Sequence, residues 1–255
     1  MIPYDNIAGR YDELPVRQKV ADVHLAAFGA TRPFPTPSPL VLDIGCGTGN
    51  QLTANQQAWP TLRQVGVDLS AGMLRQAQQK NGRIPWVQSN AAQLPFAEAT
   101  FDYISCQFSY HLWADKAGGF AEIWRVLRGN GRFLLTNLNP DAMPGWHYYH
   151  YFPAAQHLDL RRFWPVPTLV AYLRHLGFTT IQVSAVQKSW AEPLADFAHL
   201  VRQRHHTSQL MGISDADYET GCVAVETAVR QTPTAHIPSQ LNLLTLLADK
   251  PPYDW

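Results

Sequence analysis

Cysteine is scarce in this sequence: Cys46, Cys106 and Cys222 lie far apart and form no CxxC pair. This scarcity argues against a disulfide scaffold or a cysteine zinc site, and it fits a reducing compartment. Net charge is also missing, because 20 Lys and Arg residues balance 20 Asp and Glu residues. A neutral chain is not typical of proteins whose affinity depends on neutralising nucleic-acid phosphates or an anionic membrane surface.

Long hydrophobic runs are absent as well. No uncharged stretch approaches the roughly 18 to 20 apolar residues that a membrane span needs, and no internal repeat or low-complexity tract is visible. The opening segment, MIPYDNIAGRYDELP, carries acidic residues and no apolar stretch of signal-peptide length. We therefore expect a soluble, cytoplasmic protein with no membrane span and no nucleic-acid partner. A 46% apolar composition provides enough material for a sizeable core.

Short apolar runs alternate with helix-length segments between about residues 40 and 138. The predicted strands are Leu40–Ile44, Val65–Leu69, Ile84–Gln88, Phe101–Gln107 and Arg132–Leu138. The predicted helices between them are Gln51–Trp59, Ala71–Gln79 and Lys116–Leu127. Alternating strands and helices indicate an α/β fold, in which right-handed crossovers place helices on both faces of a parallel sheet.

The flanking segments have patterns of their own. Valines at helical spacing predict a helix from about Val16 to Ala30, and four prolines between Thr31 and Pro39 predict an extended linker. After the core, we predict helices at Pro167–Leu176, Pro193–Gln209 and Asp215–Arg230, and strands at Thr179–Val186 and Leu241–Leu247. Gly177 is expected to end the first of these helices, because glycine suits the left-handed cap position.

The most specific motif is VLDIGCGTGN, at residues 41–50. An apolar strand runs directly into Gly45, Gly47 and Gly49, and a helical pattern follows. Glycine permits positive φ and removes the β-carbon, so the backbone can approach a ligand at the carboxyl end of the strand. The second strand, VGVD, then ends in Asp68, whose carboxylate is placed to accept hydrogen bonds from ribose hydroxyls.

Two nucleoside cofactors compete for such a loop. A dinucleotide fold prefers G-x-G-x-x-G, with the helix N-terminus holding pyrophosphate, whereas this chain has G-x-G-x-G and Asn50. Asp43 would repel pyrophosphate but would suit an ammonium group. S-adenosyl-L-methionine carries an ammonium, a sulfonium, a ribose and an adenine, and no phosphate, so we favour it. The alternative that Asp43 only ties the loop backbone together is compatible with this choice.

Several motifs follow one another in an order that is typical of one enzyme family: VLDIGCGTGN, VGVDLS, SNAAQLPF, FDYISC and EIWRVLRGNGRFLL. From Tyr4 to about Leu138 the chain resembles the class I S-adenosylmethionine-dependent methyltransferases. It is most similar to their small-molecule branch, which includes the ubiquinone and menaquinone biosynthesis C-methyltransferases. The resemblance implies a Rossmann-like, seven-stranded, mostly parallel sheet with helices on both faces and a helical, aromatic substrate cover. One of the last two strands would be antiparallel.

The resemblance also implies site residues and a domain plan. The expected cofactor contacts are Tyr4, Arg10, Tyr11, Asp43, Gly45, Cys46, Gly47, Gly49, Asp68, Leu69, Met73, Asn90, Ala91 and Gln107. Relatives often have Asp where this chain has Asn90, which still offers an acceptor to the adenine amine. We predict one methyltransferase domain over residues 1–255. It would consist of a cofactor-capping lead and linker (1–39), a cofactor-binding core (40–138), and a substrate cover with completing strands (139–255).

The methyl acceptor is expected to meet an aromatic segment. Seven of the 19 residues from Trp146 to Trp164 are Phe, Trp or Tyr, and they could wall a pocket for an aromatic or hydrophobic small molecule. The alternative is that they pack the cover onto the sheet. Transfer from a sulfonium is an in-line displacement, and a base is needed only where the acceptor must lose a proton. His111, His147 and His150 are the candidate catalytic residues, and no metal site is predicted.

Three functions therefore remain open. The leading one is methyl transfer from S-adenosyl-L-methionine to a small molecule, with S-adenosyl-L-homocysteine as the product. A nicotinamide-dependent oxidoreductase on the same kind of sheet is the second, and a catalytically inactive protein that binds the methyl donor or its product is the third. The sequence identifies neither the acceptor, nor the atom that is methylated, nor the oligomeric state.

Overall fold

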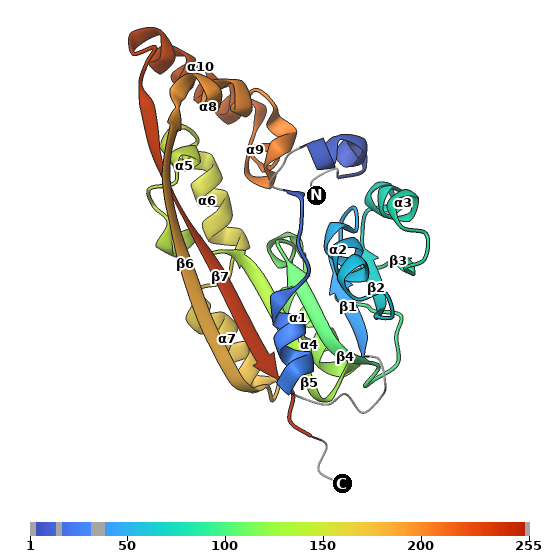
Figure 1. The fold of residues 1–255 in the computed structure, drawn as a ribbon. Helices are drawn as coiled ribbons and strands as arrows, with labels where there is room; N and C mark the ends of the chain where they lie inside the picture. Colours follow the sequence, from blue (N-terminus) through green and yellow to red (C-terminus); the bar gives the residue numbers. More distant parts are fainter. Residues whose placement is uncertain (1–3, 14–16, 32–38, 253–255) are drawn as a thin grey trace. The chain divides into compact units, whose positions relative to one another are not determined.

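Seven strands form one sheet in the computed structural model of the chain, in the order β3-β2-β1-β4-β5-β7-β6 (Figure 1). The structure describes residues 4–13, 17–31 and 39–252. The strands are β1 (Leu40–Ile44), β2 (Arg63–Asp68), β3 (Trp86–Gln88), β4 (Phe101–Gln107), β5 (Leu127–Leu138), β6 (Thr179–Pro193) and β7 (His236–Asp249).

The first five strands are parallel. β1 pairs with β2 and β4, β2 pairs with β3, and β4 pairs with β5, all in parallel register. β7 runs against β5, because the N–H of Asn130 donates to the carbonyl of Lys250 while that of Asn139 donates to Asn242. The predicted mostly parallel sheet with one antiparallel strand among the last two is therefore confirmed.

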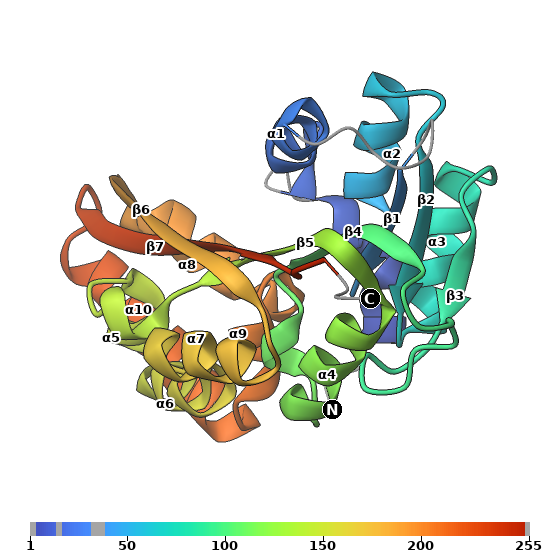
Figure 2. The same cartoon turned by 90° about the horizontal axis from the view of Figure 1, so that it is seen from below.

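Helices connect the strands on both faces of the sheet. The longer ones are α1 (Val23–Thr31), α2 (Asn50–Ala58), α3 (Ala71–Lys80), α4 (Lys116–Val126), α6 (Pro153–Arg162), α7 (Val166–His175), α8 (Leu194–Val201) and α10 (Asp215–Gln231). η1 (Tyr4–Glu13) is a 3-10 helix of ten residues. Shorter helical turns are η3 (Tyr110–Leu112), η4 (Pro140–Ala142), α5 (His147–Tyr151), η5 (Arg204–His206) and α9 (Ser208–Gly212). Figure 2 shows α1 and α2 on one side of β1, β4 and β5, and α4 on the other.

The order of the strands fixes where a ligand can bind. The chain winds outward from β1 to β2 and β3, then returns to the other side of β1 with β4 and β5. In open α/β sheets such a reversal leaves the carboxyl ends of the two central strands free for a ligand. β1 is buried on both faces, as its continuous apolar run predicts for a central parallel strand. The glycine motif follows β1 at this edge.

The helix predicted over residues 16–30 is wrong in its start and in its buried face. α1 begins at Val23, because the Asp22 carboxylate accepts the backbone N–H groups of His24 and Leu25 and caps the helix there. Val23 is 67% exposed, whereas Leu25 and Phe28 are buried. The start of that predicted helix and most of the proline-rich linker lie outside the described residues.

The helix predicted over residues 193–209 is also wrong. The chain forms α8, then η5, then α9. The Arg204 guanidinium explains the break: it donates to the carbonyls of Leu210 and Ile213 and lies 4.6 Å from the ring centre of Tyr218. These contacts require the backbone to turn back on itself instead of continuing as a helix.

Most other predicted elements are confirmed within a few residues at their ends. α7 ends before Gly177, which has φ of 104° and so takes the predicted left-handed conformation. α10 begins after Ser214, whose hydroxyl accepts the N–H of Asp217. β6 and β7 extend well beyond the strands predicted over 179–186 and 241–247, and β5 begins at Leu127, five residues before its predicted start.

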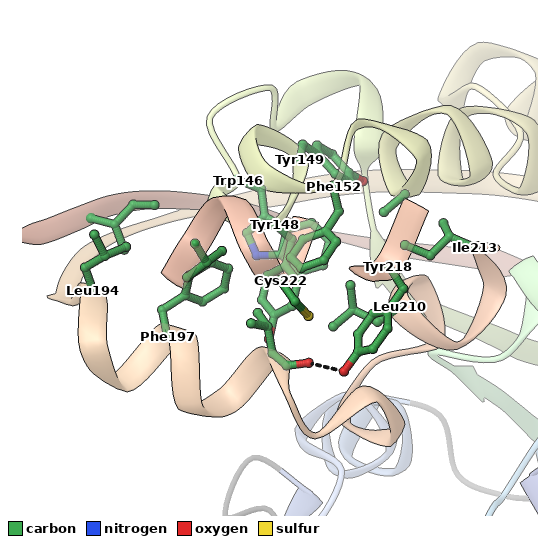
Figure 3. Close-up of a cluster of buried hydrophobic side chains, with 14 of the residues drawn as sticks. Trp146, Tyr148, Tyr149, Phe152, Leu194, Phe197, Leu210, Ile213, Tyr218 and Cys222 are labelled. Atoms are coloured by element: carbon green, nitrogen blue, oxygen red, sulfur yellow. Dashed lines mark hydrogen bonds between the residues drawn. The ribbon is translucent and has the colours of Figure 1, made fainter. Parts of the chain in front are cut away.

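The chain divides into two compact units, each with its own core. The glycine-loop unit comprises the described residues up to Asn137 together with 167–184 and 245–252. The aromatic unit comprises 138–166 and 185–244. In the aromatic unit, the side chains of α5 pack with those of α8, α9 and α10 (Figure 3). The single domain predicted over 1–255 stays a prediction.

Candidate functional site

Three glycines allow the turn that leaves β1. Gly45, Gly47 and Gly49 have φ values of 74°, 55° and 76°, in the region that L side chains rarely adopt. A β-carbon at Gly45 would lie 2.3 Å from Cβ of Ser109, so side-chain contact excludes one there. A β-carbon at Gly47 would meet no atom of the described residues within 4 Å. Among these residues, the backbone at the middle of the loop is therefore left uncovered, as a ligand-binding loop requires.

The loop is tied to the neighbouring strand β2. The N–H groups of Gly45 and Cys46 both donate to the carbonyl of Val67, at 2.7 and 3.0 Å. Cys46 is buried, and burial together with the nearby carboxylates raises the pKa of its thiol well above the ordinary value. The thiol is therefore neutral, as expected for a small loop residue and not for a nucleophile.

Asp68 ends β2 and lies across this loop. Its Oδ2 accepts the Gly47 N–H at 2.8 Å and its Oδ1 accepts the Ser70 N–H at 2.9 Å. Burial raises the pKa of Asp68, and these backbone hydrogen bonds offset part of that rise. A carboxylate offers about four acceptor positions, so both oxygens can still accept hydroxyl groups of a ligand. The charge of Asp68 also raises the pKa of Tyr11, although burial is the larger cause.

A second acid lies beneath the loop. Asp43 is buried in β1 and accepts a hydrogen bond from the Ser105 hydroxyl at 2.7 Å. Burial raises its pKa to about 6, and the charges of Asp22 and Asp68 act in the same direction. Lys19 is the cation that opposes this rise. A buried group of acids with one nearby lysine favours a ligand that brings positive charge.

The N-terminal segment η1 is held against the start of α3. The Asp5 carboxylate accepts hydrogen bonds from the Gly72 N–H and from the Ser70 hydroxyl, the latter at 3.0 Å. The same Ser70 oxygen caps α3 by accepting the N–H of Met73 at 3.1 Å. These hydrogen bonds lower the pKa of Asp5, so its carboxylate is ionised at neutral pH. An anion at the first turn of a helix is favourable.

The same segment also reaches the start of α2. The Asp12 carboxylate accepts hydrogen bonds from the Thr48 hydroxyl at 2.8 Å, the Asn50 amide at 2.7 Å and the Lys80 ammonium at 2.8 Å. A protein carboxylate therefore occupies the first turn of α2, where a dinucleotide fold holds pyrophosphate. Sequence reasoning missed both aspartates. The signal was present in YDNIAGRYD, where each tyrosine is followed by an acid.

The aromatic residues of η1 lie together, and its arginine does not join them. The rings of Tyr4 and Tyr11 meet edge to face with their centres 6.4 Å apart. Arg17 donates to the Tyr11 hydroxyl at 2.8 Å and lies over its ring. Arg10 is exposed and pairs with Glu13 at 3.4 Å. Its expected role at the cofactor stays a prediction.

The remaining cofactor candidates follow or end strands, except for Met73, which lies in the first turn of α3: Leu69 follows β2, Asn90 and Ala91 follow β3, and Gln107 ends β4. Leu69 is 50% exposed, which is unusual for leucine and leaves its side chain open to a ligand, whereas Met73 and Ala91 are buried. The exposed Asn90 accepts the N–H of Ala92 through its side chain, so its amide starts a turn. The Ser89 N–H donates to the Asp68 carbonyl, which keeps this turn beside the end of β2.

His111 lies in the glycine-loop unit, two residues beyond the serine that contacts Gly45. Its ring is buried, and its Nδ1 lies 3.3 Å from the amide nitrogen of Asn137. An amide nitrogen can only donate, so Nδ1 is the acceptor and the ring proton of a neutral imidazole is on Nε2. In this tautomer Nε2 carries a hydrogen-bond donor, and a catalytic role for His111 stays a prediction.

The other two candidate histidines belong to the aromatic unit. His147 is buried, with its ring centre 4.3 Å from that of Phe197, and burial lowers its pKa to about 4. It is therefore neutral at pH 7, although its Nε2 lies 3.2 Å from Oε1 of Glu192. His150 is exposed and contacts the ring of Tyr151. Catalytic roles for these two histidines stay predictions.

The aromatic segment forms a core of its own. Five of its seven aromatic side chains are buried: Trp146, Tyr148, Tyr149, Phe152 and Phe163. The first four pack with apolar side chains of α8, α9 and α10, including Phe197 and Leu210 (Figure 3). This packing gives the aromatic residues a structural role within their own unit. A role as the wall of an acceptor pocket stays a prediction.

Two further surveys concern only the described part of the chain. Within it, no group of three or more His, Cys, Asp or Glu side chains is arranged to hold a metal ion. None of the helices in residues 4–13, 17–31 and 39–252 combines the length and the apolar character that a membrane crossing requires.

Comparison with known proteins adds independent findings. A family model described as a methyltransferase domain matches residues 42–135. The demethylmenaquinone methyltransferase of Deinococcus radiodurans is 37% identical over 106 residues, which are 40% of this chain and 44% of that protein. The demethylmenaquinone methyltransferase of Lactiplantibacillus plantarum is 32% identical over 168 residues, which are 57% of this chain and 67% of that protein.

A solved structure shows the same fold. Phosphoethanolamine N-methyltransferase 2 of Haemonchus contortus, in complex with S-adenosyl-L-methionine, has a TM-score of 0.58 at 18% identity. The likeness covers 98% of this chain and 60% of that one. At this identity the likeness shows the fold alone. The match to this chain spans between about two fifths and two thirds of the two curated relatives.

Proposed function

Because the chain belongs to the class I S-adenosylmethionine-dependent methyltransferases, we propose that it transfers a methyl group from S-adenosyl-L-methionine to a small-molecule acceptor. The observation that carries this proposal is the pairing of a three-glycine loop, open in front of Gly47, with the carboxylate of Asp68 at the next strand end. The product would be S-adenosyl-L-homocysteine. We place the reaction in the cytoplasm.

The residues at the loop fit this cofactor better than a dinucleotide. Asp68 would bind the ribose hydroxyls, and the backbone at Gly47 would border the methionine portion. The acids Asp43 and Asp68 favour a ligand that carries ammonium and sulfonium charges and no phosphate. Asp12 at the start of α2 supports this choice, because it would repel a pyrophosphate from that helix N-terminus.

The cofactor supplies an activated methyl group, so the protein has to position the acceptor in line with the breaking bond. We assign His111 as the residue that orients the acceptor. With Nδ1 engaged by Asn137, its Nε2–H would donate to an acceptor oxygen and would stabilise negative charge on it. This assignment favours an acceptor with an acidic hydroxyl or enol, which needs little help to lose its proton.

An aromatic or hydrophobic acceptor fits the relatives. Both curated relatives named above are demethylmenaquinone methyltransferases, which are named for a quinone acceptor. The half-exposed Leu69 and the partly exposed Tyr4 and Tyr11 give the site an apolar border. We propose that the methyl acceptor is a small molecule with a planar or hydrophobic part. We also propose that the protein has no nucleic-acid partner.

The test is a screen of small-molecule acceptors with methyl-labelled donor, comparing the wild type with His111→Ala. The expected result is transfer to a planar hydroxylated or quinol acceptor, reduced about a hundredfold in the variant because a donor to the developing charge is lost. His157→Ala, which alters an exposed histidine, is the matched control and should retain full activity. Binding of S-adenosyl-L-homocysteine should be unchanged in both variants.

The competing functions give different outcomes in the same screen. Binding of S-adenosyl-L-homocysteine with no turnover on any acceptor would favour a catalytically inactive binding protein. Thermal stabilisation by NAD(H), with none by S-adenosyl-L-homocysteine, would favour an oxidoreductase and would contradict the proposal.

A further inference from the structure

One charged side chain at the glycine loop has no role in the function proposed so far. Lys19 is half-buried in the segment between η1 and α1. Its ammonium lies 4.8 Å from the ring centre of Phe108. Phe108 is the first residue after β4 and has a φ of 54°, held by a hydrogen bond from its N–H to Thr136. Lys19 therefore lies over the turn that leaves β4.

This turn is in direct contact with the glycine loop. The hydroxyl of Ser109, the residue after Phe108, donates to the carbonyl of Ile44 at 2.8 Å. A β-carbon on Gly45 would overlap the Ser109 side chain. The contact between Lys19 and Phe108 thus places a cation over the residue that precedes Ser109, and Ser109 contacts the start of the glycine loop. The methionine portion of the cofactor is expected at this end of the site.

Charged groups of both signs lie near the Lys19 ammonium. Burial lowers the pKa of Lys19, and the charge of Arg17 acts in the same direction, whereas the charges of Asp43 and Asp22 offset part of this fall. Neither acid forms a direct ion pair with Lys19. Asp43 accepts a hydrogen bond from the Ser105 hydroxyl, and Asp22 accepts one from the Tyr103 hydroxyl and caps α1. Within the described residues, the contact of the Lys19 ammonium is with an aromatic face. Such a cation is weakly compensated and can take an anionic ligand group.

We propose that Lys19 binds the α-carboxylate of the cofactor's amino-acid end, while Asp43 attracts its α-ammonium. The proposal rests on the function proposed above and assigns a further residue to that site. The amino-acid end of S-adenosyl-L-methionine is a zwitterion, so it needs opposite charges that are held apart from one another. Asp43 and Lys19 are such a pair, one fixed in β1 and the other in the segment before α1.

The choice of ligand separates this role from a general effect on the fold. 5′-Methylthioadenosine shares the adenine, ribose and thioether of S-adenosyl-L-homocysteine but lacks both the α-carboxylate and the α-ammonium. A residue that binds the carboxylate affects only the affinity for S-adenosyl-L-homocysteine. A residue that only supports the loop affects both ligands.

The experiment is calorimetric titration of both ligands into the wild type, Lys19→Ala and Lys19→Arg. We expect Lys19→Ala to weaken S-adenosyl-L-homocysteine binding about tenfold to hundredfold, the range for a lost charge-assisted hydrogen bond. Its affinity for 5′-methylthioadenosine should change less than about twofold. Lys19→Arg should keep most of the affinity, and Lys188→Ala, at an exposed position on β6, is the matched control.

Two results would overturn the inference. Equal weakening of both ligands by Lys19→Ala would show a structural role, and unchanged affinity for S-adenosyl-L-homocysteine would show no role. If the wild type bound no S-adenosyl-L-homocysteine, the proposed function would fail together with the inference. If the wild type bound it and Lys19→Ala bound it equally well, only the inference would fail.

Discussion

Single side chains decide which charge this site accepts. Burial raises the pKa of both Asp43 and Asp68; the charges of Asp22 and Asp68 add to the rise at Asp43, and the charge of Asp5 adds to the rise at Asp68. Folding such acids together costs free energy, which a cationic ligand recovers on binding. The site therefore couples ligand binding to ionisation.

This coupling predicts a pH dependence of binding. The pKa of Asp43 is about 6 in the free protein, and a ligand ammonium favours its ionised form. Lowering the pH through 6 therefore protonates Asp43 and weakens ligand binding. Calorimetry should show S-adenosyl-L-homocysteine binding about tenfold weaker at pH 5 than at pH 7.5. Asp43→Asn should bind weakly at both values. Equal wild-type affinity at pH 5 and 7.5 would remove Asp43 from this role.

At the level of helices and strands, η1 is the element outside the sheet that is held against the candidate site. It is fastened by two carboxylates, Asp5 at the start of α3 and Asp12 at the start of α2. Both helix starts border the loop or the end of β2. We propose that the segment covers a ligand held between them and that its carboxylates oppose the escape of a cation.

We predict that the double variant Asp5→Ala/Asp12→Ala binds S-adenosyl-L-homocysteine about tenfold more weakly, because hydrogen bonds to charged groups are lost. The effect should appear as faster dissociation, which stopped-flow or surface plasmon resonance can measure. Glu13→Ala is the control, since its ion pair with Arg10 is exposed and contributes little. An unchanged dissociation rate in the double variant would show that η1 does not retain the ligand.

Local signals made the glycine loop predictable. The apolar run of β1, the three glycines and the acid at residue 68 lie within 30 residues, and each has a local physical reason. The motif YDNIAGRYD marks Asp5 and Asp12 as candidates, but it does not show what they bind, because Asp5 meets its partner Ser70 across 65 positions of the chain. The valine spacing before α1 misled because a buried cap at Asp22 outweighs the pattern.

The packing of the aromatic segment was also not predictable, because its contacts are distant in the sequence. Its composition suggested a pocket wall, whereas most of its side chains complete the core of a separate unit. Their partners on α8 and α10 come some 40 to 80 residues later in the chain, and short-range patterns do not report such pairings. The break between α8 and α9 escaped prediction for the same reason, since the partners of Arg204 are tertiary contacts.

The chain as a whole joins two units with separate cores, and each contains one buried acid with a pKa of about 6. In the aromatic unit this acid is Asp159, which accepts hydrogen bonds from Tyr149 and Gln209 at 2.8 and 2.9 Å. Its other oxygen is buried and accepts no hydrogen bond from any residue that the structure describes. Burial is the main cause of its raised pKa, so the folded unit prefers the protonated acid.

The sign of the stability effect follows directly. Between pH 3.8 and about 6, folded Asp159 holds a proton that the unfolded chain releases, so stability falls as the pH rises through this window. The pKa difference corresponds to about 3 kcal/mol. The stability of Asp159→Asn, measured by thermal unfolding, should therefore fall less between pH 4.5 and 7 than that of the wild type. Asp196→Asn, at an exposed position of the same unit, should follow the wild type. Parallel curves for Asp159→Asn and wild type would contradict the assignment.

The identity of the cofactor is tested most directly by calorimetric titration of S-adenosyl-L-homocysteine and of NADH into the wild type and Asp68→Ala. We expect saturable binding of S-adenosyl-L-homocysteine and none of NADH. Loss of the charge-assisted hydrogen bonds to the ribose should weaken S-adenosyl-L-homocysteine about tenfold to hundredfold in Asp68→Ala. Binding of NADH instead, or equal affinity of wild type and Asp68→Ala for S-adenosyl-L-homocysteine, would contradict the site described at the glycine loop.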